Sequence, residues 1–326
     1  MVKGLSIILA CFNKEDTIAM TIESIENQTL VKNNRRDFVE IICVDDASTD
    51  NTVGVIEKLE YKYGNIKLVK HEKNSSVLVA RFSGIKVSTK DHIIFVDPDD
   101  HLDETYHEEL YNAAIKSQAD ITQTPSVYRY YGNDKKMPAS SWFSNMPPGI
   151  IKISPNNFKR IVNGNWLTLW NRMIKRDKLI KLAYFPPYYI NFMEDVFIYL
   201  SMLMVSDTVC NVVTKGYYYY NLTNDVNHLG KTSKKAIPTT QIFHLVDVFM
   251  IESRNMIYSN CISKFRAVYL KNFCDEYAKS FDIMENFISN NGVNKNNDSN
   301  YISPIDRQRE FELIRNIYVE LLKSNY

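Results

Sequence analysis

The sequence lacks the groupings of cysteine and histidine that mark zinc proteins and disulfide-rich proteins. Its five cysteines are scattered without a C-x-x-C pair, and its six histidines form no H-x-x-x-H or His/Cys group. We therefore expect no zinc site and expect the cysteines to be reduced residues of the core. Any metal that this chain binds is expected to have oxygen ligands.

Long hydrophobic runs and an excess of one charge are also missing. No stretch approaches the roughly 20 apolar residues that a membrane span needs, and the run LSIILACF at 5–12 lacks the features of a signal peptide. A formal net charge of +1 provides no basic field for nucleic acid. We therefore expect a globular, cytoplasmic protein whose partner is not nucleic acid.

What the sequence does contain is an alternation of strand and helix patterns from residue 5 to about residue 130. Apolar runs typical of strands lie at 5–12, 37–44, 65–70, 92–96 and 119–131, and segments with helical spacing of apolar residues lie between them. One of these helices is expected to begin at Asp50, a plausible N-cap. The alternation predicts an α/β fold with a mostly parallel sheet flanked by helices.

The remainder of the chain is predicted to add loops and a second region. Residues 131–165 are rich in proline and are expected to form loops over the sheet, whereas 193–203 fit a helix and 216–221 a strand. We place a first domain at 1–230 and a smaller α-helical region at 231–326. Apolar stripes on its first and last helices predict packing on the first domain, or on another subunit of a homo-oligomer.

Two clusters of carboxylates follow two of the predicted strands. The stretch FVDPDD contains Asp97, Asp99 and Asp100, and VDDASTD contains Asp45 and Asp46. Taken singly, each cluster could be an ordinary turn, because Asp and Pro favour turns. Two clusters at strand ends of one sheet instead favour a ligand site, in which one cluster binds Mg²⁺ or Mn²⁺ and the other hydrogen-bonds a base or ribose.

Six stretches in a fixed order resemble a known family. They are SIILACFNKEDTIAMTIESIENQT, IICVDDASTDNT, VARFSGI, IIFVDPDD, LWNRMIKRDKL and MEDVFI, which together reach from residue 5 to about residue 200. The sequence resembles the family 2 glycosyltransferases of bacterial surface glycans, which have the A-type, Rossmann-like nucleotide-sugar-binding fold. Each motif is weak alone, but six with this order and spacing are specific.

The resemblance implies a set of residues around a nucleotide sugar. Asp46 would accept a hydrogen bond from uracil or an equivalent base, Arg81 would neutralise the diphosphate or support the base, and Asp97 would face the ribose. Trp170 and Asn171 would shape the sugar pocket, and three residues would line the nucleotide pocket: Ala10, Phe12 and Glu15. Two structural alternatives stay open: Arg81 as a cation on a helix surface, and Trp170 as a core residue.

The resemblance also implies a metal site and a general base. Asp99, supported by Asp100, would bind Mn²⁺ or Mg²⁺. Many relatives carry an arginine that grips the diphosphate where Asn221 stands, so His228 or Lys231 in the next loop could take its place, with His228 at the metal. The structural alternative for both residues is a solvated loop. Asp195 would be the general base and Glu194 would orient the donor sugar or the base. Acids at the start of a helix also favour the helix dipole, which is the structural alternative.

The function implied is an inverting, metal-dependent hexosyl- or N-acetylhexosaminyltransferase. It would move a sugar from a nucleotide donor, most simply a UDP-sugar, to a hydroxyl of a surface glycan or a lipid-linked acceptor, the latter at the inner face of the cell membrane. A sugar nucleotidyltransferase is one alternative, disfavoured because ACFNKED has no glycine. A degenerate nucleotide-binding interaction module is the other. The donor sugar, the acceptor and the linkage stay open.

Overall fold

The computed structural model describes residues 2–34, 37–130, 136–138, 147–154, 157, 161, 168–182 and 194–221. The chain divides into two compact units, Met1–Lys234 and Lys235–Tyr326, and all described residues belong to the first. The helical region predicted at 231–326 and the candidate ligand His228 therefore lie outside the described residues.

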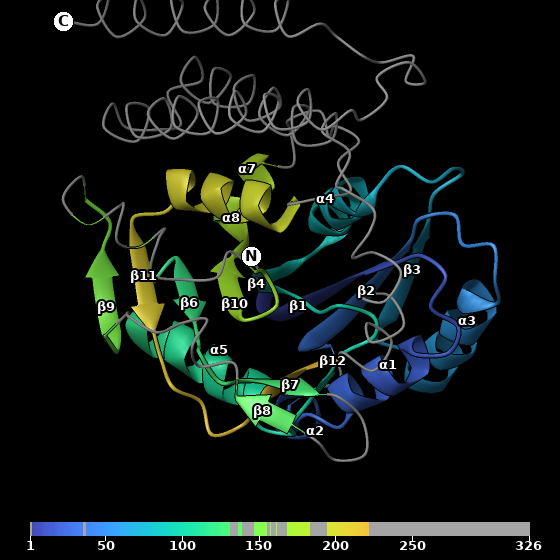
Figure 1. Cartoon of the computed structure of the whole chain (residues 1–326), viewed down its shortest axis with the longest axis horizontal. Helices are drawn as coiled ribbons and strands as arrows, with labels where there is room; N and C mark the ends of the chain where they lie inside the picture. Colours follow the sequence, from blue (N-terminus) through green and yellow to red (C-terminus); the bar gives the residue numbers. More distant parts are fainter. Residues whose placement is uncertain are drawn as a thin grey trace, which may run out of the picture. The chain divides into compact units, whose positions relative to one another are not determined.

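The first unit is built on an eight-stranded sheet with the order β3-β2-β1-β4-β10-β6-β11-β9 (Figure 1). Four neighbouring strands are parallel: β1 (Val2–Cys11), β2 (Val39–Asp45), β3 (Ile66–Lys70) and β4 (Lys90–Phe95). The chain runs outward from β1 through β2 to β3 and then returns to β4 on the other side of β1. Strand order thus reverses at β1, which is where α/β sheets bind ligands.

The other half of the sheet is mixed. β10 (Arg172–Lys175) runs antiparallel to both β4 and β6 (Ile121–Gln123). β11 (Thr208–Asn211) runs parallel to β6 and antiparallel to β9 (Gly149–Lys152). With its parallel half this sheet confirms the predicted α/β fold.

Helices cover both faces of the sheet (Figure 1). On one face lie α4 (Val77–Val87), α7 (Arg176–Leu182) and α8 (Glu194–Val205). On the other lie α1 (Ile18–Glu26), α2 (Thr29–Lys32), α3 (Thr52–Tyr63) and α5 (Tyr106–Ser117). Because both faces are covered, the parallel strands are buried on both sides, which explains their nearly continuous apolar sequences.

One close contact sets the position of α4. Gly84 lies against β1, where an added Cβ would stand 2.4 Å from Ile8 Cγ2. Only a residue without a side chain allows the helix to approach the strand so closely. The first turns of α4, which carry Arg81, are thereby held near the carboxyl ends of the parallel strands.

A second, four-stranded sheet has the order β5-β12-β7-β8. Its strands are β5 (His101–Leu102), β12 (Tyr218–Asn221), β7 (Val127–Tyr130) and β8 (Lys136–Pro138). The single strand predicted at 119–131 is therefore wrong: it is two strands, β6 and β7, in two different sheets. Pro125 separates them, since it has no N–H to donate and its carbonyl accepts a bond from Val127 N in a tight turn.

The prediction of loops at 131–165 is also wrong where the structure describes that segment, because β8 and β9 lie in it. β9 pairs with β11, more than fifty residues later in the chain, and such distant pairing leaves no local pattern. β8 is a three-residue strand that pairs antiparallel with its neighbour β7. The strands predicted at 5–12, 37–44, 65–70 and 92–96 and the helices between them are confirmed to within a few residues. Asn51, not Asp50, is the N-cap of α3. Asp50 Oδ1 nevertheless accepts a bond from Thr52 N.

His107 in α5 is buried, and neither ring nitrogen has a hydrogen-bond partner among the described residues. Burial lowers the pKa of His107 to about 3, whereas the ordinary value in an unfolded chain is about 6.5. The unfolded chain therefore binds a proton at a higher pH than the folded chain does. The contribution of neutral His107 to the free energy of unfolding is therefore complete above pH 6.5 and is lost as the pH falls towards 3.

Between pH 7 and pH 5, we expect the free energy of unfolding to decrease by about 2 kcal/mol less in His107→Leu than in the unaltered protein. Leucine cannot bind a proton and fills a similar volume. Urea unfolding of both proteins at the two pH values measures the effect. An acid sensitivity that is the same in His107→Leu as in the unaltered protein would contradict the assignment.

Candidate active site

The loops that follow the first two parallel strands are joined to each other at the carboxyl edge of the sheet. Thr49 N donates to Asn13 Oδ1 at 2.8 Å, and Asn51 N donates to Glu15 Oε2 at 2.8 Å. Glu15 N in turn donates to Asp50 Oδ2. The structure thus places Glu15 in this brace between two loops, and not among the residues that line the pocket beside it.

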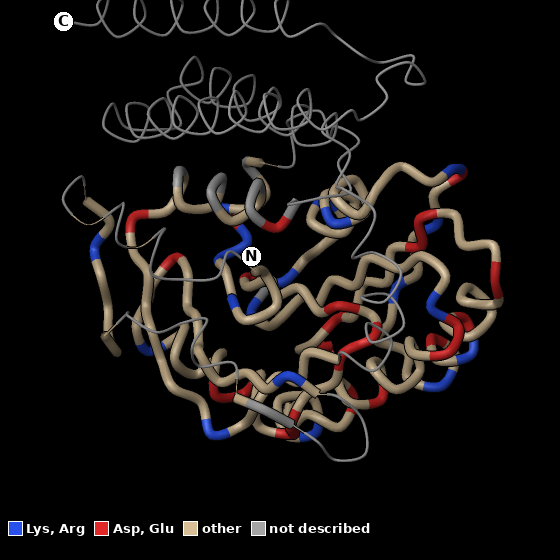
Figure 2. Tube along the Cα trace, in the orientation of Figure 1, with Lys and Arg blue, Asp and Glu red and all other residues tan. Residues whose placement is uncertain are grey.

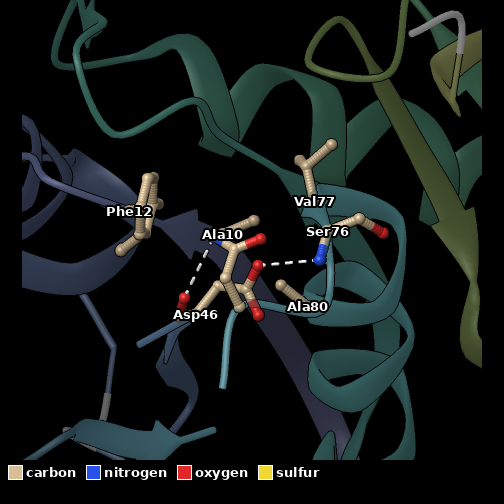
Figure 3. Close-up of a pocket in the computed structure, with 8 residues that line it drawn as sticks. Ala10, Phe12, Asp46, Ser76, Val77 and Ala80 are labelled. Carbon is tan, nitrogen blue, oxygen red and sulfur yellow. Dashed lines mark hydrogen bonds between the residues drawn. The ribbon is translucent and has the colours of Figure 1, made fainter. Parts of the chain in front are cut away.

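A cavity of about 490 Å³ opens between the end of β1 and the start of α4 (Figure 3). This volume is in the range of small-molecule sites. Phe12 stands on one side and Val77 on the other, with Asp46 between them. Three residues predicted to bind nucleotide are brought together here; the full lining is Ala10, Cys11, Phe12, Asp46, Asn74, Ser76, Val77 and Ala80.

Asp46 is only 3% exposed, and its carboxylate is held by the loop that follows β3. Asp46 Oδ1 accepts from Ser75 N at 2.9 Å and lies 2.7 Å from His71 Nδ1, and Oδ2 accepts from Ser76 N at 2.9 Å. Oδ2 makes no second hydrogen bond to the described residues. Because a carboxylate oxygen can accept two, Asp46 keeps the capacity to accept a further donor, such as a base N–H.

His71 was not predicted from the sequence, although its position directly after the third strand was a signal. Its Nε2 lies 2.9 Å from Ser83 Oγ on α4, so the imidazole joins Asp46 to that helix. Beside it, Ser76 has φ 92° and ψ 155°, a conformation that residues with a side chain rarely adopt. Such backbone strain, typically about 1–3 kcal/mol, is concentrated at functional sites.

The acidic turn, Asp97–Asp100, follows β4 and is clamped by β12. Tyr218 OH donates to Asp100 Oδ2 at 2.5 Å, and Asn221 N donates to Asp100 Oδ1 at 2.7 Å. Thr17 Oγ1 holds the other side through Pro98 O at 2.9 Å. Burial, and then the charges of Asp97 and Asp99, raise the pKa of Asp100 well above its ordinary value. Figure 2 shows the wider gathering of acidic residues near β1 and β12.

Arg81 joins the acidic turn to α8. It is 5% exposed, and it donates to Asp97 Oδ1 at 3.1 Å and to Asp195 Oδ1. The alternative of a cation on a helix surface is therefore wrong. The predicted general base thus lies in the same charge cluster as the acidic turn, while Glu194 begins α8 and its side chain lies outside the described residues.

Lys14, in the loop after β1, was also missed. Its Nζ donates to Asp99 Oδ2, and the two side chains are 32% and 28% exposed. Burial alone would lower the pKa of Lys14, but the negative charge of Asp99, with Asp97 and Asp100, outweighs it and raises the pKa.

Trp170 and Asn171 lie behind the site. Trp170 is 3% exposed and stacks on Tyr218 with ring centroids 4.7 Å apart. Asn171 is buried and donates to Thr124 O at 2.9 Å. Neither residue lines the cavity, so the described structure agrees with the alternative that Trp170 is a core residue. Through its stacking on Tyr218, Trp170 supports the clamp on the acidic turn.

A divalent cation fits this site only if the substrate supplies some of the ligands of the ion. In the part of the chain that the structure describes, no group of three His, Cys, Asp or Glu side chains could hold a metal ion. Asp97 and Asp99 offer hard carboxylate oxygens that are partly exposed. Mg²⁺ is commonly held by one or two carboxylates together with substrate phosphates, and the two aspartates suit that arrangement.

A family model described as glycosyl transferase family 2 matches residues 6–197. The chain belongs to glycosyltransferase family 2. This membership confirms the resemblance carried by the six motifs and argues against the nucleotidyltransferase alternative. Within the described residues of this family 2 protein, none of the helices has the length and apolarity that a membrane crossing requires.

Two curated relatives act on poly(ribitol phosphate), according to their names. The chain is 26% identical over 262 residues to the poly(ribitol-phosphate) beta-N-acetylglucosaminyltransferase TarP of Staphylococcus aureus, covering 79% of this chain and 75% of TarP. It is 35% identical over 119 residues to a poly(ribitol-phosphate) beta-glucosyltransferase of Bacillus spizizenii, covering 36% of this chain and 18% of that protein. Two further relatives are matched over 33% and 49% of their length. The chain thus spans less than half of the length of the Bacillus spizizenii protein and of these two further relatives.

Among solved structures, S. aureus TarS residues 1–349 in complex with UDP-GlcNAc is similar, with a TM-score of 0.64 and 17% sequence identity. The match covers 98% of this chain and 81% of the TarS chain. At this identity the likeness shows the fold alone, and it confirms the A-type architecture that the motifs predicted.

Proposed function

We propose that this family 2 protein is an inverting, metal-dependent glycosyltransferase that uses a UDP-sugar. One observation carries the proposal: the cavity with Asp46, the acidic turn and the Arg81–Asp195 pair lie along one edge of the sheet. A nucleotide sugar consists of a nucleoside, a diphosphate and a sugar in series. These three parts would lie in the cavity, at the acidic turn and beside the Arg81–Asp195 pair, respectively. UDP-GlcNAc in the TarS complex and the names of the relatives support the donor and a cell-wall glycan acceptor.

In this proposal the cavity holds the nucleoside. The exposed ring of Phe12 offers an aromatic surface for the base. Asp46 accepts an N–H of the base with the free capacity of Oδ2, and the bonds from Ser75, Ser76 and His71 keep its carboxylate in place. Asp97 then lies next to the ribose and diphosphate, at the end of β4.

Asp99 and Asp97 would hold a divalent cation between the protein and the donor diphosphate. When bound, such a cation stabilises negative charge that develops on the leaving diphosphate. Arg81 adds a fixed positive charge on the same side, because its bonds to Asp97 and Asp195 leave it little freedom to move.

Asp195 would act as the general base. The acceptor oxygen attacks the anomeric carbon on the face opposite the diphosphate, its proton moves to the Asp195 carboxylate, and the bond between the anomeric carbon and the diphosphate oxygen breaks. Attack from the opposite face inverts the configuration. Arg81 orients the carboxylate for this transfer. Contact with the membrane face and self-association through 231–326 stay predictions.

We expect UDP to raise the melting temperature of the full chain in the presence of Mn²⁺ and much less in EDTA. A ligand that binds only the folded state at 100 times its Kd adds about 2.7 kcal/mol of stability. Differential scanning fluorimetry with UDP, ADP, GDP and a panel of UDP-sugars measures this, and release of UDP upon addition of poly(ribitol phosphate) tests transfer. Absence of a shift with every nucleotide, or equal shifts with all three, would contradict the proposed donor.

A further inference from the structure

The contact between Lys14 and Asp99 joins two backbone segments that are fixed independently. Lys14 N donates to Thr52 Oγ1 at 2.7 Å, and Lys14 O accepts from Ile18 N at 3.0 Å. On the other side, Asn221 Nδ2 donates to Asp99 O at 2.9 Å. Because both backbones are held, the ion pair can open through rotation of the two side chains alone.

Among the described residues, two cations lie beside the acidic turn, and Lys14 is the one that is held less firmly. Arg81 is 5% exposed and is bound to both Asp97 and Asp195, whereas the Lys14 side chain is 32% exposed and pairs with Asp99. The lysine ammonium sits on a flexible four-carbon stem. Water reaches this partly exposed ion pair and weakens it, so another cation can compete with Lys14 for Asp99.

A divalent cation on the Asp99 carboxylate and the Lys14 ammonium repel each other, so each weakens the binding of the other. A metal ion that arrives alone must therefore overcome this repulsion or displace Lys14 and leave its charge without that partner. A metal ion that arrives with a diphosphate brings a new anionic partner for the ammonium. The same exchange thus becomes more favourable when the donor is bound.

We propose that Lys14 makes metal binding depend on the donor: its ammonium holds Asp99 until a nucleoside diphosphate draws it away and frees the carboxylate for the divalent cation. This inference rests on the proposed function. Lys14 is then a positioning residue of the metal site. Since linkage is reciprocal, UDP and Mn²⁺ raise each other's affinity by one shared factor, and Lys14 contributes part of it.

The test compares the Kd of Mn²⁺, followed through the electron paramagnetic resonance signal of free Mn²⁺, with and without saturating UDP. In Lys14→Gln, we expect Mn²⁺ alone to bind about five-fold tighter, and the coupling factor with UDP to fall about five-fold. Lys14→Arg keeps the charge and should keep a coupling factor at least as large as that of the unaltered protein. Lys70→Gln is the matched control, because Lys70 pairs with Glu57 on the surface at 2.6 Å, and it should change neither quantity.

An unchanged coupling factor in Lys14→Gln, or weaker binding of Mn²⁺ alone, would overturn the role of Lys14 and leave the proposed function intact. An unaltered protein that binds no UDP at any Mn²⁺ concentration would overturn both. Should Lys14→Gln fail to fold, as judged by its melting temperature, Lys14→Arg decides, since a coupling factor below that of the unaltered protein contradicts the role of the charge.

Discussion

Replacing Asp195 with asparagine should lower the rate of sugar transfer by about 10²–10⁴-fold, while the affinity for the UDP-sugar stays within a few-fold. An asparagine oxygen can still accept the hydrogen bond from Arg81, so the geometry of the cluster is preserved. The amide cannot take up the proton of the acceptor hydroxyl at neutral pH. Steady-state rates together with calorimetric donor affinity measure the two quantities.

The competing explanation is that Asp195 serves only as a counter-ion of Arg81 near the start of α8. It predicts a loss of about 0.5–2 kcal/mol in stability and little change in turnover per folded molecule. Asp177→Asn is the matched control, since Asp177 is an acid in the first turn of α7. A well-folded Asp195→Asn protein with turnover like that of Asp177→Asn would exclude Asp195 as the base.

Replacing Asp99 with alanine should remove the Mn²⁺-dependent part of UDP binding. Replacing residues that only hydrogen-bond to the ligands of a metal typically lowers metal affinity about 10–100-fold. Replacing a direct ligand should lower it at least as much. The weaker, metal-independent binding should remain, because the cavity around Asp46 does not involve Asp99. Calorimetric titration of UDP with Mn²⁺ and with EDTA separates the two parts.

Asp16→Ala provides the control for Asp99→Ala. Asp16 is an exposed acid in the loop after β1, and its removal changes the net charge by the same amount. If Asp99→Ala and Asp16→Ala retained equal Mn²⁺-dependent affinity for UDP, Asp99 would not be a metal ligand.

The parallel half of the sheet could be predicted because its strands are buried on both faces and therefore read as apolar runs. The mixed half could not. β9 and β11 pair with each other across a gap of more than fifty residues, and the apolar pattern at 119–131 gave no sign that β6 and β7 belong to different sheets. Pro125 was the one local signal of that break.

The candidate site divides in the same way. Asp46, Arg81, Asp97, Asp99 and Asp195 lie in motifs whose order in the sequence pointed to them. The residues that hold them were missed, because their contacts join distant segments and their residue types are ordinary surface types. Lys14 is 85 residues from Asp99, and His71 is 25 residues from Asp46.

The clamp on the acidic turn has a consequence for the order in which the protein is made. Tyr218 and Asn221 reach Asp100 across 118 and 121 residues of chain. At about 5–20 residues per second, the ribosome needs roughly 6–24 s after Asp100 to supply them. During that interval β1–β4 can already pair, yet the turn that carries Asp97 and Asp99 lacks its support. Donor binding is thus expected to begin only when β12 has emerged, and an expressed fragment that ends before Asn221 would hold the nucleoside cavity without a fixed acidic turn.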